Sequence, residues 1–349
     1  MTDILENSEE DKYSEENLES TDIGMKTDKE VIKKDFIPHF FPTYRINRKF
    51  YPVPIIIVVI IAGILAYLTY VQAGIRIDGG YFPESEMGLL GGILNGIIYT
   101  ALAGISAFII IFVIKKKGIG VLMYIFGFSF ALIGFFQTWF FGEIIIWLAF
   151  SAIPIVFYLL LYFEFIFFTA VFTIFILYRY FTSKSIKTKN FIVLYIGLLI
   201  GASMGVLMPL WTTLAILIGI SCWDIFAVLY KRGPIKQLID IASQPAEEEV
   251  LSEETLKQKI QTGEFEYDTS KLEIGIGDLA FYSMLTSSAL VQTNNLIVMI
   301  LTALAIIIGT GITISGLKRN KILPGLPISI FLGIGTMMVS WYLISTFII

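Results

Sequence analysis

Residues 271–283 read KLEIGIGDLAFYS, and within this stretch the carboxylate of Asp278 stands at the start of a long apolar run. A second acid, Asp224, interrupts the earlier apolar run ISCWDIFAVL at residues 220–229. A charged side chain at bilayer depth costs roughly 3 kcal/mol, so such residues usually mark chemistry or an ion pathway. Asp224 and Asp278 are therefore the candidate functional residues of this chain.

The composition indicates a membrane protein. Of the 349 residues, 56% are hydrophobic and 15% are charged, and the mean hydropathy is +0.78. A soluble domain carries about 25% charged residues. We therefore expect an integral, multi-pass membrane protein in contact with the lipid bilayer, located in the plasma membrane if its source is prokaryotic. The single cysteine, Cys222, excludes an internal disulfide and a cysteine cluster for a structural metal.

Nine apolar segments predict an all-α fold with about nine transmembrane helices, each near the roughly 20 residues that a bilayer core requires. Residues 120–181 are too long for one crossing at about 1.5 Å per residue, and Pro154 divides them into two helices. The predicted spans are residues 51–72, 88–114, 120–146, 155–181, 191–209, 211–230, 274–291, 296–317 and 323–348.

Two polar segments divide the chain. Residues 1–50 are acidic and have too few apolar side chains for a core, so we expect them to be largely disordered. Residues 231–272 form a second polar segment, which separates helices one to six (51–230) from helices seven to nine (273–349).

Lysine and arginine recur in every second connection between the predicted spans. They gather at residues 45–49, 115–117, 179–189, 231–236 and 318–321, whereas the intervening connections are acidic or uncharged. Short cytoplasmic loops carry an excess of basic residues. The pattern therefore predicts a cytoplasmic N-terminus, a C-terminus outside and a cytoplasmic loop at residues 231–272.

Glycines recur at intervals of four residues in two of the predicted spans. The sets are Gly88, Gly92 and Gly96 in the second span and Gly197, Gly201 and Gly205 in the fifth. Small residues at this spacing let neighbouring helices approach closely. We therefore expect two tightly packed helix pairs rather than a ligand site.

The two aspartates are predicted to lie at the same depth. Asp224 is about six residues from the end of its span and Asp278 about four from the start of the next, or roughly 9 and 6 Å. A close pair of carboxylates cannot both ionise cheaply and shares a proton. Such a pair can hydrolyse an amide, since one member accepts a proton from water while the other donates one to the carbonyl oxygen. A proton- or cation-coupled transporter that uses the same pair is the alternative, and a purely structural role for each aspartate also stays open.

The sequence lacks the residues that other protease mechanisms and dinucleotide binding require. The only histidine, His39, precedes the first span, which excludes a His-Glu-x-x-His metalloprotease and a serine protease with an intramembrane histidine base. Gly275-Ile276-Gly277 lacks the third glycine of a dinucleotide-binding loop. We expect no cofactor, no metal and no nucleic-acid partner.

Three motifs in chain order resemble the presenilin and signal peptide peptidase family of intramembrane aspartyl proteases. Gly275-Ile276-Gly277-Asp278 resembles the Gly-x-Gly-Asp motif, Trp223-Asp224 stands where the family carries Tyr-Asp, and Pro324-Gly325-Leu326 stands where it carries Pro-Ala-Leu. The sequence around Asp278 and the predicted orientation are most similar to those of a microbial (archaeal) presenilin homologue.

This resemblance implies a hydrolase that cuts transmembrane segments of other membrane proteins, with Asp224 and Asp278 as catalytic residues. It also implies motif or substrate-binding roles for Trp223, Gly275, Gly277, Pro324, Gly325 and Leu326. An unwound substrate needs new partners for its freed backbone groups in a dry site. Strand-like edges flanking Ile274 and near Leu326 are the expected partners. In the presenilin branch the loop between spans six and seven is self-cleaved, which makes residues 231–272 a candidate for the same event.

Overall fold

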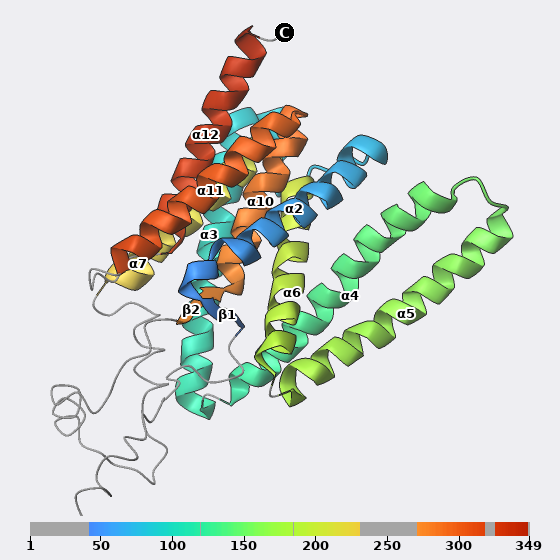
Figure 1. Cartoon of the computed structure of the whole chain (residues 1–349), viewed down its shortest axis with the longest axis horizontal. Coiled ribbons are helices and arrows are strands. Elements are labelled where there is room, and N and C mark those ends of the chain that lie inside the picture. Colours follow the sequence, from blue (N-terminus) through green and yellow to red (C-terminus); the bar gives the residue numbers. More distant parts are fainter. Residues whose placement is uncertain (1–41, 119, 184, 231–270, 318–324, 348–349) are drawn as a thin grey trace, which may run out of the picture. The chain divides into compact units, whose positions relative to one another are not determined.

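The computed structural model describes residues 42–118, 120–183, 185–230, 271–317 and 325–347. These ranges contain nine α-helices (Figure 1). They are α2 (Pro52–Ala66), α3 (Glu84–Lys117), α4 (Val121–Phe150), α5 (Ile155–Thr182), α6 (Ile186–Leu207), α7 (Leu210–Leu229), α10 (Ile276–Thr293), α11 (Leu296–Leu317) and α12 (Leu326–Phe347). A 3-10 turn precedes α2 at Arg48–Phe50, and a π-helical turn at Tyr67–Gln72 follows it.

Eight helical segments in the described part of the chain are long and apolar enough to cross a membrane. The ninth helix, α10, has 18 residues and is less apolar than the others. The predicted all-α, multi-pass membrane architecture is confirmed. The expectations for residues 1–41 and 231–270 lie outside the described residues, and the predicted orientation of the termini stays a prediction.

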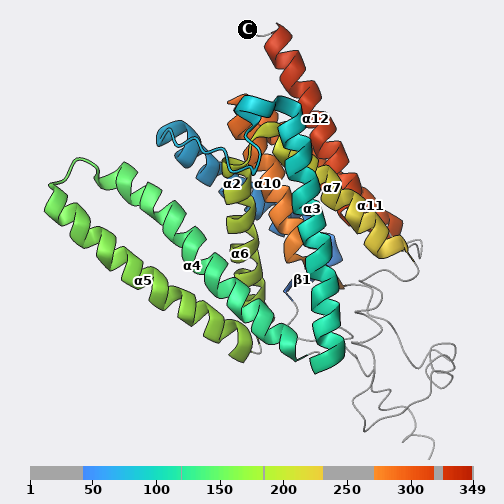
Figure 2. The same cartoon turned by 180° about the vertical axis from the view of Figure 1, so that it is seen from behind.

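Helix α10 lies among the other helices, with its most extensive packing against α6 and further contacts to α2, α7, α11 and α12 (Figures 1 and 2). Its hydroxyl side chains at Ser283, Thr286 and Ser287 are fully buried. Ser283 and Thr286 donate to carbonyls one turn back in α10, and Ser287 donates to the Ala62 carbonyl of α2 over 3.2 Å. Because neighbouring helices cover it, α10 does not need the hydropathy of a lipid-facing helix.

The predicted glycine faces are confirmed at five of the six positions. A methyl group at Gly201 or Gly205 would overlap the backbone of α10, and one at Gly92 or Gly96 would overlap α7. Gly197 also faces α10, with the Ile276 carbonyl 3.3 Å from the place of its missing Cβ. The exception is Gly88, which has a φ of +55° at a kink in α3 and no described neighbour within 4 Å of the place of its missing Cβ.

The two strands of the described chain form one antiparallel sheet. Strand β1 (Thr43–Asn47) lies just before the first membrane helix, and β2 (Lys271–Gly275) ends where α10 begins. The predicted seventh span began at Ile274, and this boundary is wrong by two residues. Ile274 pairs with Tyr44 in the sheet, so strand pairing satisfies its backbone groups and the helix starts only at Ile276.

Candidate active site

Asp224 lies in the last two turns of α7 and faces the start of α12. Its Oδ2 accepts a hydrogen bond of 3.2 Å from the backbone N–H of Leu326, the first residue of α12. The first N–H groups of a helix have no partner within the helix, so they are available to an anion. The side chain of Leu326 is buried, which fixes its backbone in place.

Asp278 lies in the first turn of α10, directly after β2. The N-terminal end of a helix dipole favours a negative charge at this position. The Oδ2 of Asp278 is 3.5 Å from the place where a Cβ would stand on Gly325. The carboxylates of Asp224 and Asp278 therefore lie beside two successive residues, Gly325 and Leu326, and they are close enough for their charges to interact.

Three glycines lie near Asp278 at positions where the packing of the described residues would also allow a Cβ. A Cβ at Gly275, Gly277 or Gly325 would meet its nearest atom at 3.9, 3.8 or 3.5 Å, which are ordinary contact distances. All three have negative φ angles or lie in regular helix, since none is among the described glycines with positive φ. None of the three carries a side chain that could cover the carboxylate of Asp278.

A buried hydroxyl network lies one turn further along α10. The hydroxyl of Tyr282 donates to Ser329 Oγ of α12 over 3.3 Å, and Ser329 Oγ is 3.1 Å from the Thr310 hydroxyl of α11. These hydrogen bonds connect α10, α11 and α12 about one helical turn after Asp278. They position the start of α12 relative to α10, although sequence reasoning did not select any of them.

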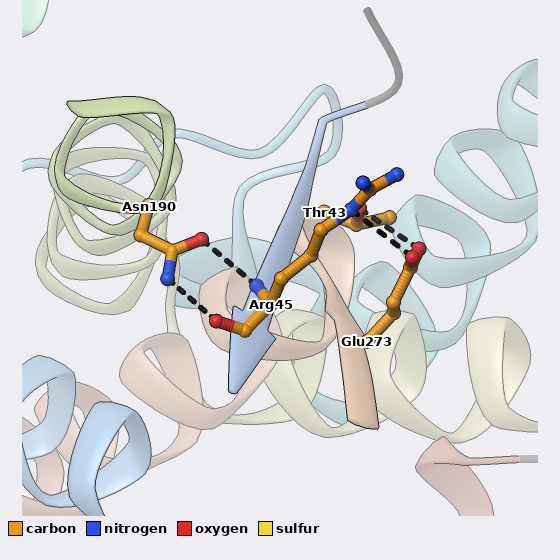
Figure 3. Close-up of polar contacts among 4 residues, drawn as sticks. All are labelled: Thr43, Arg45, Asn190 and Glu273. Atoms are coloured by element: carbon orange, nitrogen blue, oxygen red, sulfur yellow. Dashed lines mark hydrogen bonds and ion pairs between the residues drawn. The ribbon is translucent and has the colours of Figure 1, made fainter. Parts of the chain in front are cut away.

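The two-stranded sheet holds the segment that leads into Asp278 (Figure 3). Glu273 on β2 accepts a hydrogen bond of 3.1 Å from the Thr43 hydroxyl and forms an ion pair of 3.0 Å with Arg45 Nε. The Ile276 N–H donates to the carbonyl of Pro42, which extends the pairing to the first residue of α10. Thr43 and Glu273 are 230 residues apart in the chain, and no local pattern predicted their pairing.

Of the other predicted site residues, Trp223 points elsewhere. Its ring packs edge-on against Phe108 of α3, with ring centroids 5.9 Å apart, and contacts the helix at Gly104. A direct contact between Trp223 and substrate at the aspartates stays a prediction. Pro324 lies outside the described residues, whereas Gly325 and Leu326 of the same motif are at the site.

The fold and the site define an all-α, multi-pass membrane protein in which carboxylates from two helices face one backbone segment at the start of a third. The Presenilin family model matches residues 44–253 and 242–348, and the chain belongs to the presenilin family. Presenilin-B of Dictyostelium discoideum is 37% identical over 129 residues, which are 36% of this chain. That alignment spans 25% of the length of Presenilin-B. A presenilin-like protein of Arabidopsis thaliana is 24% identical over 333 residues, covering 74% of this chain and 80% of that protein.

Proposed function

We propose that this protein is an intramembrane aspartyl protease that hydrolyses peptide bonds within transmembrane segments, with Asp224 and Asp278 as its catalytic pair. The observation that carries the proposal is the convergence of both carboxylates on Gly325 and Leu326. The two acids lie on helices α7 and α10. The backbone between their carboxylates is that of Gly325 and Leu326, which belong to the third motif that resembles the family. Membership of the family does not favour the transporter alternative.

The chemistry follows from a shared proton. One carboxylate, ionised, takes a proton from a water molecule, while its protonated partner donates to the oxygen of the scissile carbonyl. The Leu326 N–H stabilises the ionised form of Asp224, because a hydrogen bond to a charged group is stronger than one between neutral groups. The water oxygen then adds to the carbonyl carbon, and the peptide C–N bond breaks as the nitrogen receives a proton.

The substrate in this proposal is a transmembrane helix that unwinds beside the aspartates. Unwinding frees backbone N–H and C=O groups, which need partners in a dry site. Strand β2, which ends three residues before Asp278, offers such partners as an extended edge. The absence of side chains at Gly275 and Gly325 leaves room for a substrate chain to approach the Asp278 carboxylate.

The test is cleavage of a single-span reporter by the purified protein in proteoliposomes. We expect Asp224→Asn and Asp278→Asn each to reduce turnover at least about 1,000-fold, because an amide cannot exchange the proton that the reaction requires. The matched control is Glu143→Gln, which makes the same chemical change in α4, a helix that packs mainly against α5 and α6. Turnover that survives in both aspartate variants would show that the protease assignment is wrong.

A further inference from the structure

A groove runs along α6 between α2 and α4, the helices labelled in Figure 1. Its volume is about 620 Å³, which is within the range of small-molecule sites in proteins. The residues of α6 that line it lie on one helical face, from Lys187 to Leu199. The residues of α2 that line it are Ile57, Ile61 and Leu65, which also share one face. The groove therefore follows α6 for about 18 Å, at 1.5 Å per residue.

The groove is apolar along most of its length. Leu198 of α6 is 4% exposed at its floor, whereas Ile61 of α2 and Ile145 of α4 are 37% and 45% exposed at its rim. Two hydroxyl groups line its middle, those of Thr138 and Tyr195, and they hydrogen-bond each other over 2.5 Å. This part of the groove therefore offers an apolar surface of the kind that an acyl chain covers.

One end of the groove is polar. Lys187 and Asn190, in the first two turns of α6, line this end together with Tyr44 of β1. The Nδ2 of Asn190 donates a hydrogen bond of 2.6 Å to the Arg45 carbonyl (Figure 3), and a carboxamide nitrogen has a second hydrogen to donate. The ammonium group of Lys187 has three donors. Both side chains can therefore donate to the oxygens of an anionic headgroup.

The polar end also carries positive charge. Lys187 and Lys189 lie close together at the start of α6, and Lys189 is near enough to Arg45 for their charges to interact. Residues 165–223 include no acidic residue. Glu273 forms an ion pair of 3.0 Å with Arg45 and so offsets one positive charge of this cluster. An anion at Lys187 would be electrostatically complementary to the charge that the two lysines add.

The length of the groove matches one leaflet of a bilayer. A hydrocarbon core is about 30 Å thick, so one leaflet contributes about 15 Å. The apolar part of the groove, from Asn190 to Leu199, is about 14 Å long at 1.5 Å per residue. A transmembrane segment of another protein would instead cross both leaflets and bring apolar side chains to Lys187. A molecule with a charged head and an acyl chain fits both ends of the groove.

We propose that this groove binds one anionic phospholipid, with an acyl chain between α2 and α4 and the phosphate at Lys187 and Asn190. Lys187 supplies the charge, and the second N–H of Asn190 supplies a directional hydrogen bond to the phosphate. Neither Asp224 nor Asp278 lines the groove, so this site is separate from the candidate active site. The bound lipid fills space beside α6 and stabilises the folded chain, as any ligand of the native state does.

Native mass spectrometry of the full-length protein in detergent tests the headgroup preference. The probes are phosphatidylglycerol, which is anionic, and phosphatidylcholine with the same acyl chains. We expect one phosphatidylglycerol to bind at least about fivefold more tightly than phosphatidylcholine. Lys187→Gln is expected to remove most of this preference. The matched control is Lys116→Gln, the same change at an exposed lysine in the last turn of α3, which is expected to keep it.

Two results of this measurement would overturn the proposal. One is equal affinity of the unaltered protein for the two lipids. The other is an equal loss of preference in both lysine variants, because it would show a general effect of surface charge.

A second pair of variants tests the position of the acyl chain. We expect Ile61→Trp to lower the affinity for both lipids at least about fivefold, because a tryptophan ring would occupy the groove. The matched control is Ile60→Trp, at the next residue of α2, which is 53% exposed and does not line the groove. Equal affinities in the two variants would contradict the proposed position.

Photolabelling in proteoliposomes locates the lipid in the unaltered protein, so this arm does not depend on whether Ile61→Trp folds. Each probe lipid carries a diazirine at the end of one acyl chain, and labelled peptides are identified by mass spectrometry. At residues 138–145 and 194–199, we expect labelling by phosphatidylglycerol to exceed that by phosphatidylcholine at least about fivefold.

A second groove provides an internal control for the photolabelling. It lies between α3 and α7 with a volume of about 780 Å³, and none of the described residues that line it is charged. We expect the two lipids to label it equally. The same ratio at both grooves would refute the headgroup site. Loss of the phosphatidylglycerol label on adding excess single-span reporter would show that the groove holds a protein segment, which would also refute it. Selective labelling of a protein that never cleaves the reporter would contradict the protease proposal and leave the lipid site standing.

Discussion

At the scale of single residues, the site depends on a backbone donor. Within the described residues, Asp224 accepts its hydrogen bond from the N–H of Leu326 and none from a basic or amide side chain, so this part of the structure gives no support to a purely structural pairing. A backbone donor at the start of a helix cannot reorient independently. It therefore keeps the carboxylate in one place while substrate binds and leaves.

This hydrogen bond can be removed selectively. We expect Leu326→Pro to lower kcat roughly 10- to 100-fold relative to Leu326→Ala, because proline lacks the N–H and a hydrogen bond to a charged group contributes about 1.5–3 kcal/mol. Both variants shorten the buried side chain, and proline is accepted at the first residue of a helix. Reporter cleavage at saturating substrate measures the effect, and equal kcat for the two variants would show that the N–H of Leu326 has no role.

At the scale of elements, the close approach of α6 and α10 determines where Asp278 lies. The glycines of α6 bring its backbone against that of α10, and the start of α6 also carries Asn190, which binds β1. One helix therefore contacts both the strand pair before Asp278 and the helix that carries it. A displacement of α6 would disturb both parts together.

We expect Gly201→Ala to lower the free energy of unfolding by about 1–3 kcal/mol, because its methyl group would overlap the Ala280 carbonyl and force the helices apart. The matched control is Gly335→Ala in α12, where no atom of the described part of the chain lies within 4 Å of the added methyl group. Alanine there is expected to raise stability by up to about 1 kcal/mol through its higher helix propensity. Unfolding in detergent measures both, and a Gly201 variant as stable as the Gly335 variant would contradict the packing argument.

At the scale of the whole molecule, the described helices differ in how much of their surface is exposed. Helix α5 exposes large aromatic side chains such as Phe163, Phe167 and Phe168, which suit a hydrocarbon environment. Helix α10 instead buries hydroxyl groups against its neighbours. The helix with Asp278 is therefore screened from lipid, and this allows a polar site within a membrane protein.

The predicted orientation of the chain rests on its loop charges and can be measured across a single helix. In a Cys222→Ser background, we expect Lys116→Cys to react with an impermeant maleimide only from the cytoplasmic side and Ser151→Cys only from outside. The two positions flank α4, which has 30 residues and spans about 45 Å. Reaction of both from one side would show that α4 does not cross the bilayer, and reversed labelling would show that the predicted orientation is wrong.

The sequence by itself determined the helices and the two candidate acids. A membrane segment must satisfy its backbone hydrogen bonds internally, so an apolar run of sufficient length already specifies a helix. A carboxylate within such a run is a candidate functional residue, because placing a charge in the bilayer costs free energy. Only the tertiary structure decided that Asp224 and Asp278 converge on Gly325 and Leu326. It also decided that Thr43–Asn47 pairs with Lys271–Gly275 and that Asn190 hydrogen-bonds the backbone of Arg45. Asp278 and Gly325 are 47 positions apart in the chain, and the hydrogen-bonded pairs are 102 to 230 apart. Such pairings follow from how helices pack rather than from any local pattern.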